Sequence, residues 1–206
     1  MILKRKFDLA KKVLRSRSNL VSLVVNYIRF VDDQADGFWG SLTDEEEEAL
    51  SSIIEKYCKD QGPIIEFGTL FGTTTLLMAG RKGLNQRLIT LDNFSWNPFM
   101  MPNKDHERFT RRVLRYVIDN SSVELVNDDI NLFKSNWQGG APALVFLDAD
   151  HRYEAVKSDI EWSVDRGAKV ICGHDFGTEW PGVERAVREI FGSNFSTSGS
   201  LWWSVA

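Results

Sequence analysis

From residue 63 onward, the chain alternates between short apolar runs and longer segments with amphipathic spacing. Apolar runs of four or five residues are typical of strands buried on both faces of a sheet, and the longer segments are typical of helices. The expected strands are 64–67, 87–91, 123–126, 143–147 and 169–172, followed by an antiparallel pair near Phe195 and at 201–205. The expected helices are 73–82, 104–119, 151–164 and 181–191. This alternation predicts an α/β fold, with a mostly parallel sheet that carries helices on both faces.

One more helix is expected before the first strand, from Thr43 to about Lys59. Thr43 and Glu46 have the spacing of a capping box, and the acidic residues 44–48 place negative charge at the positive end of the helix dipole. Gly62 and Pro63 end the helix. We therefore interpret the acidic run as a helix start, in preference to an acidic binding site.

The first 40 residues are expected to form an N-terminal helical arm, and residues 41–206 to form the main domain. Residues 1–17 carry a local charge of +6, although the whole chain has a net charge of −4. The negative total gives no reason to expect nucleic acid as a partner. One short basic helix makes only marginal contact with a membrane surface, so a solvated helix or a dimerisation arm is the preferred interpretation of this segment.

The sequence also indicates a compartment. The apolar stretch 20–28 is too short to span a bilayer, and no small-residue cleavage site follows it. Cys58 and Cys172 lie far apart in different kinds of local sequence, so we expect both to be buried and reduced. These features predict a cytoplasmic protein.

A glycine-containing turn follows the first strand, where Gly68 and Gly72 are separated by three residues. A dinucleotide fingerprint would need glycines near positions 70 and 73, which are Leu70 and Thr73, and no Gly-Lys-Ser/Thr follows as in a P-loop. Glu66 places a negative charge beside the turn, which suits a ligand with an ammonium group better than a pyrophosphate. The alternative is a tight strand–helix turn with a purely structural role.

Acidic residues also end the next two strands. Asp92 lies twenty residues after Gly72, and an acid at this place typically accepts hydrogen bonds from ribose hydroxyls. Asp128 and Asp129 follow the third strand and could flank the same ligand or cap the next helix.

Together these residues resemble the cofactor site of the class I S-adenosylmethionine-dependent methyltransferases, over about residues 38–206. The resemblance implies a Rossmann-like methyltransferase fold, with a mostly parallel seven-stranded sheet and an antiparallel C-terminal strand. It implies S-adenosylmethionine as the cofactor. The residues that it assigns to cofactor binding are Glu66, Gly68, Thr69, Gly72, Thr74, Asp92, Asp128 and Asp129.

A second polar cluster follows the fourth and fifth strands. Asp148 and His151 come after the fourth, and His174 and Asp175 after the fifth. Adjacent parallel strands lie about 4.8 Å apart, so these side chains can converge and hold a divalent cation. The alternatives are a helix-capping role for His151 and an Asx-type turn at His174 and Asp175.

This cluster resembles a branch that includes the macrolide-sugar O-methyltransferases and related natural-product enzymes. The resemblance implies that Asp148, His174 and Asp175 bind a metal and that His151 is the general base. Asp150, two residues after Asp148, could orient His151. His174 stands where the sugar enzymes carry Glu. The resemblance implies Mg²⁺, but imidazole is a poor ligand for Mg²⁺ and a better one for Mn²⁺, Fe²⁺ or Zn²⁺. The expected cofactor is therefore a divalent cation, with Mg and Mn as the two candidates.

The acceptor side of the crevice is expected to be aromatic. Residues 95–102 are too apolar for an ordinary exposed loop and could form a lid, with Trp180 as another wall; the alternative is that Trp96, Phe99 and Trp180 pack in the core or a dimer interface. The expected partners are a small-molecule acceptor, such as a glycoside, and a second copy of the chain in a homo-oligomer. The alternative function is a non-catalytic member of the fold that binds a nucleoside-like ligand.

Overall fold

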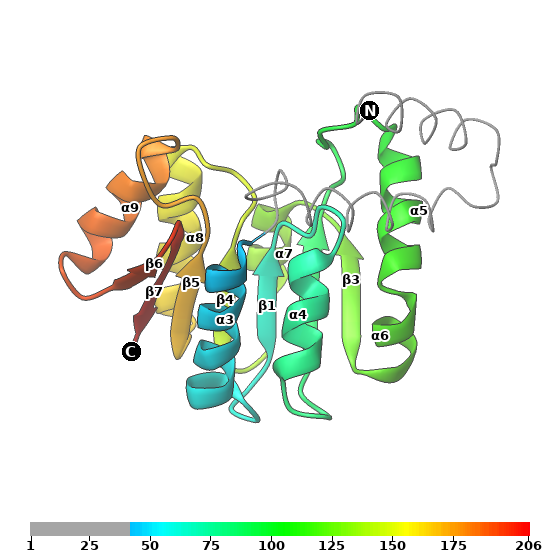
Figure 1. Ribbon diagram of the computed structural model, residues 1–206, viewed down its shortest axis with the longest axis horizontal. Helices are drawn as coiled ribbons and strands as arrows, with labels where there is room; N and C mark the ends of the chain where they lie inside the picture. Colours follow the sequence, from blue (N-terminus) through cyan, green and yellow to red (C-terminus); the bar gives the residue numbers. More distant parts are fainter. Residues whose placement is uncertain (1–41) are drawn as a thin grey trace, which may run out of the picture. The chain divides into compact units, whose positions relative to one another are not determined.

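Seven strands form one central sheet in the computed structural model, which describes residues 42–206. They are β1 (Ile64–Phe67), β2 (Leu88–Asp92), β3 (Val123–Asn127), β4 (Leu144–Leu147), β5 (Val170–Gly173), β6 (Ser196–Ser198) and β7 (Leu201–Val205). Their order is β3-β2-β1-β4-β5-β7-β6, and β7 is antiparallel to both of its neighbours (Figure 1). The predicted sheet is confirmed, and the bounds of its five parallel strands are within one residue of those expected.

Helices cover both faces of this sheet. The first face carries α3 (Asp44–Ile53), its π-helical continuation η1 (Ile54–Cys58) and α4 (Thr73–Arg81), together with α6 (Arg115–Asn120) beside β3. The second face carries α7 (Ile130–Asn136), α8 (Tyr153–Asp165) and α9 (Pro181–Phe191). α5 (Asn103–Val113) leads into α6 (Figure 1). The prediction of helices on both faces is therefore confirmed.

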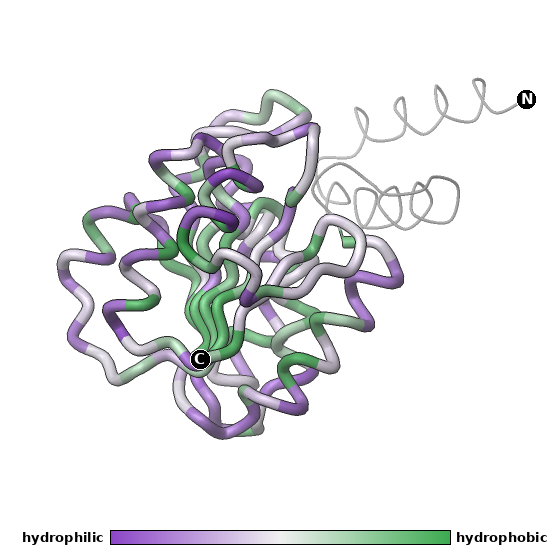
Figure 2. The backbone as a smooth tube through the Cα atoms, turned by 90° about the vertical axis from the view of Figure 1, so that its left-hand side faces the viewer, coloured by the Kyte–Doolittle hydropathy of each residue, from purple (hydrophilic) through white to green (hydrophobic). Residues whose placement is uncertain are grey.

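The two cores follow from the alternation of side chains along each strand. In β1, Ile64 packs with the helices of the first face, whereas Ile65 and Phe67 pack with those of the second. The strands accordingly form a hydrophobic centre between more polar layers (Figure 2). Cys58 and Cys172 are buried and unpaired, as predicted.

Three helix predictions need correction. The segment expected to be one helix over 104–119 is divided into α5 and α6 at Leu114. α8 begins at Tyr153, so His151 lies in the loop before it. α7 was missing from the expected helices, because a seven-residue helix is too short to give a clear apolar period.

The register of the parallel strands brings their carboxyl ends to one edge of the sheet. Phe67 pairs with Leu91 on one side and Leu147 on the other, and Leu147 pairs with Gly173. The residues that follow these strands therefore share this edge, where ligands bind in open α/β sheets. Within residues 42–206, no helix is both long and apolar enough to cross a membrane. The predicted arm, its basic segment and the apolar stretch 20–28 lie outside the described residues.

Candidate functional site at the carboxyl edge of the sheet

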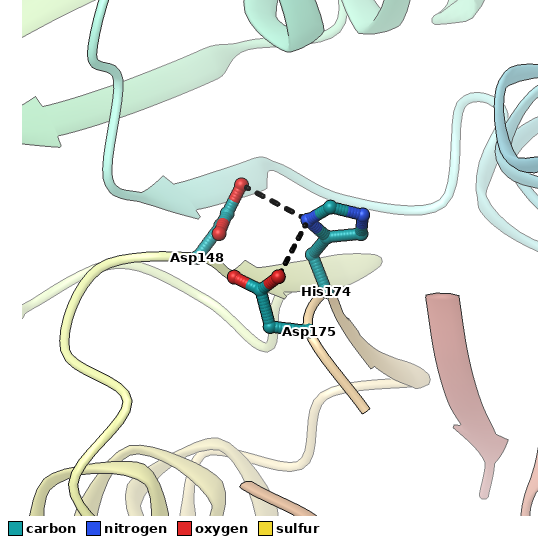
Figure 3. A group of neighbouring side chains, drawn as sticks. All are labelled: Asp148, His174 and Asp175. Carbon is teal, nitrogen blue, oxygen red and sulfur yellow. Dashed lines mark ion pairs between the residues drawn. The ribbon is translucent and has the colours of Figure 1, made fainter. Parts of the chain in front are cut away.

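Asp148, His174 and Asp175 point toward one another at the ends of β4 and β5 (Figure 3). Nδ1 of His174 lies 3.6 Å from Oδ1 of Asp175 and 4.0 Å from Oδ2 of Asp148. One ligand atom from each of the three residues lies within 4.8 Å of the others. Two carboxylates and one imidazole at this spacing form a donor set suited to a divalent cation. The structure thus brings together the three predicted metal ligands.

His151 lies beside the same carboxylates. Its Nε2 is 2.6 Å from Oδ2 of Asp175, without the direction of a hydrogen bond, and 3.7 Å from Oδ1 of Asp148. Its ring stacks on Trp180, with 4.4 Å between ring centroids. Burial opposes the charged imidazole, but contacts with Asp148 and Asp175 outweigh it and raise the pKa of His151 to about 9.

The expectation that Asp150 orients His151 is wrong. Both carboxylate oxygens of Asp150 accept hydrogen bonds from the Arg152 guanidinium, and Oδ1 also accepts from the Arg152 backbone N–H. Asp175 and Asp148 are the carboxylates that face His151. From the sequence, Asp148, Asp150 and Asp175 are all expected near His151. Only the direction of each side chain decides which of them contacts the imidazole.

Glu46 reaches the site from α3, which the sequence did not reveal. It completes the predicted capping box, since Thr43 N–H donates to its Oε2 at 2.8 Å and Glu46 N–H donates to the Thr43 hydroxyl. The same Oε2 lies 3.4 Å from Nε2 of His174. Burial opposes ionisation, but hydrogen bonds from His174, Thr43 and Ser200 hold the pKa of Glu46 well below its usual range. The acidic run thus starts a helix and also supplies one carboxylate behind the site.

The glycines of the turn after β1 are required by its backbone. Gly68 has φ +97°, and a Cβ there would clash with the carbonyl oxygen of Asp148. Gly72 has φ +84°, and a Cβ there would press on the side chain of Leu114. The turn therefore needs glycine at position 68, because any side chain there would overlap the backbone that follows β4.

Asp92 holds this turn from the end of β2. Its Oδ2 accepts hydrogen bonds from the backbone N–H groups of Thr69, at 3.1 Å, and Leu70, at 2.8 Å, while Oδ1 accepts from Phe94 N–H at 2.6 Å. These bonds give Asp92 a structural role that the sequence did not predict. Its role toward a ribose stays a prediction.

Glu66 is fully buried between β1 and α4. Its Oε2 accepts a 2.5 Å hydrogen bond from the hydroxyl of Thr75, the neighbour of the predicted Thr74. Its Oε1 is buried without a partner among the described residues. Burial raises the pKa of Glu66 to about 8. A buried carboxyl with one free oxygen is suited to accept from a donor group on a ligand.

The remaining predicted cofactor residues lie after β1, in α4 and after β3, and each has different surroundings. Thr69 is buried, and its hydroxyl lies 2.5 Å from that of Thr90. Thr74 is half-buried in the first turn of α4. Asp129 caps α7 by accepting from the N–H groups two and three residues later, which is the capping alternative considered above. Asp128 is half-buried at the same edge.

Two side chains of α5 also contact the turn after β1, and the sequence did not predict these contacts. The carbonyl oxygen of Leu70, a residue with φ +46°, lies 2.8 Å from Nε2 of His106 and accepts a 2.6 Å hydrogen bond from the Thr110 hydroxyl. His106 is fully buried between the rings of Phe71 and Phe94. A histidine at helical spacing from a threonine carries no signal of such a contact in sequence.

The apolar loop between β2 and α5 folds around one buried polar side chain. Oδ1 of Asn97 accepts from the N–H groups of Phe99 and Met101, and its Nδ2 donates to the Met101 carbonyl. Trp96 is 62% exposed and Met100 is 92% exposed. Trp96 is therefore not a core residue, and neither is Trp180, which lies on His151.

Comparison with known proteins adds a family to this geometry. A family model described as a methyltransferase domain matches residues 65–176, which include every predicted site residue. No curated protein sequence matches the chain.

Solved structures share the fold at low sequence identity. An O-methyltransferase from Bacillus cereus in complex with S-adenosylhomocysteine is 18% identical, with a TM-score of 0.63 over 95% of this chain and 94% of that one. CalS11, a TDP-rhamnose 3′-O-methyltransferase of calicheamicin biosynthesis, is 17% identical, with a TM-score of 0.60 over 98% and 93%. The O-methyltransferase TomG from Streptomyces achromogenes, in complex with S-adenosylmethionine, is 15% identical, with a TM-score of 0.59 over 81% and 82%.

Proposed function

The chain belongs to the methyltransferase domain family, and we propose that it transfers a methyl group from S-adenosylmethionine to a hydroxyl oxygen of a small molecule. The observation that carries this proposal is the position of His151, Asp148 and Asp175 at the same sheet edge as the glycine turn. A base and two carboxylates beside a cofactor turn are the groups needed to bring a hydroxyl in line with a methyl donor and remove its proton.

The chemistry of the turn fits the cofactor. S-adenosylmethionine supplies a methyl group activated on a sulfonium. The backbone around Gly68 and Gly72 leaves room for close approach, and the free Oε1 of Glu66 can accept from an ammonium group. Asp92 would bind the ribose, and Asp128 would flank the adenine. Thr69, Thr74 and Asp129 would complete the cofactor site. Thr69 also bonds to Thr90, and Asp129 also caps α7.

Metal assistance is the finer part of the proposal. Asp148, His174 and Asp175 offer two oxygens and one nitrogen, which fits a divalent cation. A cation held there would lower the pKa of an acceptor hydroxyl and orient it toward the methyl group.

The charge around His151 bears on its role as a base. With both carboxylates unneutralised, its pKa of about 9 keeps the ring protonated at neutral pH. Neutralising Asp148 and Asp175 removes the two charges that raise this pKa, which returns the imidazole toward the range where it can accept a proton. The proposed base and the proposed metal site therefore depend on each other.

The acceptor side favours a flat or cyclic molecule. The exposed indoles of Trp96 and Trp180 offer faces that stack on sugars or aromatic rings. CalS11 acts on a sugar nucleotide according to its name, which supports a glycoside acceptor. We further propose a cytoplasmic homo-oligomer. We propose no nucleic-acid partner, because the net charge of −4 gives no general attraction for a polyanion.

Calorimetry and methyl transfer test the proposal together. We expect S-adenosylmethionine to bind to the full chain, and labelled methyl to reach at least one member of a panel of glycosides and phenols. His151→Ala should abolish transfer and leave cofactor affinity unchanged, whereas Arg152→Gln, an exposed neighbour, should change neither. Absence of cofactor binding would overturn the proposal. Binding without transfer would favour the non-catalytic alternative, and transfer that survives both His151→Ala and a chelator would refute the mechanism.

A further inference from the structure

His174 is held from behind by two residues that lie far from it in the sequence. Oε2 of Glu46, in the first turn of α3, lies 3.4 Å from Nε2 of His174. The hydroxyl oxygen of Ser200, in the turn between β6 and β7, lies 2.9 Å from the same nitrogen. His174 and Glu46 are both more than nine-tenths buried. Neither Glu46 nor Ser200 is part of the proposed metal site or the proposed base.

The hydrogen bonds of Ser200 and Glu46 determine which nitrogen of His174 carries a hydrogen. The single hydroxyl hydrogen of Ser200 is donated to Oε1 of Glu46, at 2.8 Å, and the carboxylate of Glu46 can only accept. Both partners of Nε2 are therefore acceptors, so Nε2 must carry the N–H. In the neutral ring, Nδ1 then has a free lone pair, and it is the atom that faces Asp148 and Asp175 (Figure 3).

The fold makes room for this arrangement at Gly199. This residue has φ +57°, and a Cβ there would lie 2.6 Å from Oε1 of Glu46. Ser200 N–H also donates to that oxygen, at 2.7 Å. The turn between β6 and β7 is thus shaped around the Glu46 carboxylate, which is more than a capping box requires.

We propose that Glu46, with Ser200, positions His174 as a nitrogen ligand and so makes this site selective for a divalent transition metal over Mg²⁺. This inference rests on the metal site of the proposed function. A carboxylate that accepts from the distal N–H of a metal-binding histidine fixes its tautomer and ring orientation, and raises its basicity as a ligand. An imidazole among two carboxylates favours Mn²⁺, Fe²⁺, Co²⁺ or Zn²⁺, whereas Mg²⁺ prefers oxygen ligands.

Cobalt binding to the metal-free full chain provides a test that does not need an acceptor. The probe is Co²⁺, followed by its visible absorption, with Mg²⁺ as competitor. We expect Glu46→Gln, which keeps the capping box, to weaken Co²⁺ affinity about 10- to 100-fold. Ser200→Ala should weaken it by a smaller factor and guards against misfolding of the first variant. The matched control is Glu48→Gln, an exposed residue of the same helix, which should bind as the wild type does.

A second readout reports the tautomer itself. The chain has three histidines, so ring ¹⁵N resonances can be assigned by substitution. We expect His174 of the wild type to carry its hydrogen on Nε2, and Glu46→Gln to populate the other tautomer. Equal Co²⁺ affinity in wild type and Glu46→Gln, or displacement of Co²⁺ by equimolar Mg²⁺, would overturn the inference alone. Absence of Co²⁺ binding to the wild type would overturn the proposed metal site as well.

Discussion

The imidazole of His151 stacks on the indole of Trp180, with 4.4 Å between ring centroids and 27° between the ring planes. Trp180 is the residue that precedes α9, and it keeps 42% of its surface exposed. The stack fixes the plane of the proposed base, while its Nε2 lies 2.6 Å from Oδ2 of Asp175. In the proposed function, this one aromatic side chain would orient the base and also form a wall for the acceptor.

Removal of this wall should impair turnover more than cofactor binding. We expect Trp180→Ala to lower kcat about 10- to 100-fold, because a small displacement of a catalytic group has an effect of this size. Calorimetry should give an S-adenosylmethionine affinity close to that of the wild type. Trp180→Phe retains a ring and is the matched control, with a smaller loss. Equal kcat in Trp180→Ala and the wild type would show that the stack has no role in the reaction.

Two glycines in neighbouring elements should respond in opposite ways to alanine. Gly68→Ala places a Cβ against the carbonyl of Asp148 at φ +97°, so we expect a large loss of stability and of cofactor binding. Gly80→Ala lies in α4 with no atom within 4 Å of the added Cβ, so we expect a gain of about 0.5–1 kcal/mol from helix propensity. Urea denaturation measures both. Similar effects in the two variants would contradict the close approach of Gly68 to the carbonyl of Asp148.

The sheet and its functional edge were predictable because periodicity and strand ends are local properties. Runs such as 64–67 and 144–147 are buried on both faces, so their pattern alone identifies parallel strands. Parallel strands then bring their carboxyl ends to one edge without further information, which is why Asp148, His174 and Asp175 could be expected to meet.

Contacts that depend on side-chain direction or distant segments were not predictable. The hydroxyl of Thr75, which was not among the predicted site residues, bonds to Glu66. Its neighbour Thr74 was predicted to bind the cofactor, and one residue along a helix turns a side chain by about 100°. Glu46 had a complete local explanation as a capping residue, so its sequence carried no sign of His174, 128 positions later. Asp175 faces His151 where Asp150 was expected to, because only three-dimensional packing decides which carboxylate lies beside the imidazole.

Loss of the Asp92 carboxylate should loosen the glycine turn. Asp92→Ala leaves the N–H groups of Thr69, Leu70 and Phe94 without their acceptor, and each buried unsatisfied group costs about 1–3 kcal/mol. Three such groups at the lower value cost about 3 kcal/mol, so we expect the melting temperature to fall by at least roughly 6 °C, given about 2–4 °C per kcal/mol for a domain of this size. Scanning calorimetry without ligand isolates this effect from any contact with ribose. An unchanged melting temperature would show that these hydrogen bonds do not stabilise the turn.

The buried carboxyl of Glu66 should make stability fall as pH rises. Its pKa is about 8 in the folded protein and about 4.5 when unfolded, so between these values the folded state keeps a proton that the unfolded state has lost. Stability decreases with pH wherever the folded state binds more protons, so the loss begins above about pH 4.5 and is complete above about pH 8. Glu66→Gln stays neutral throughout and keeps an acceptor for Thr75. We therefore expect its melting temperature to rise relative to the wild type between pH 5 and pH 9, by on the order of 10 °C. Parallel melting profiles across this range would mean that Glu66 does not titrate with the raised pKa.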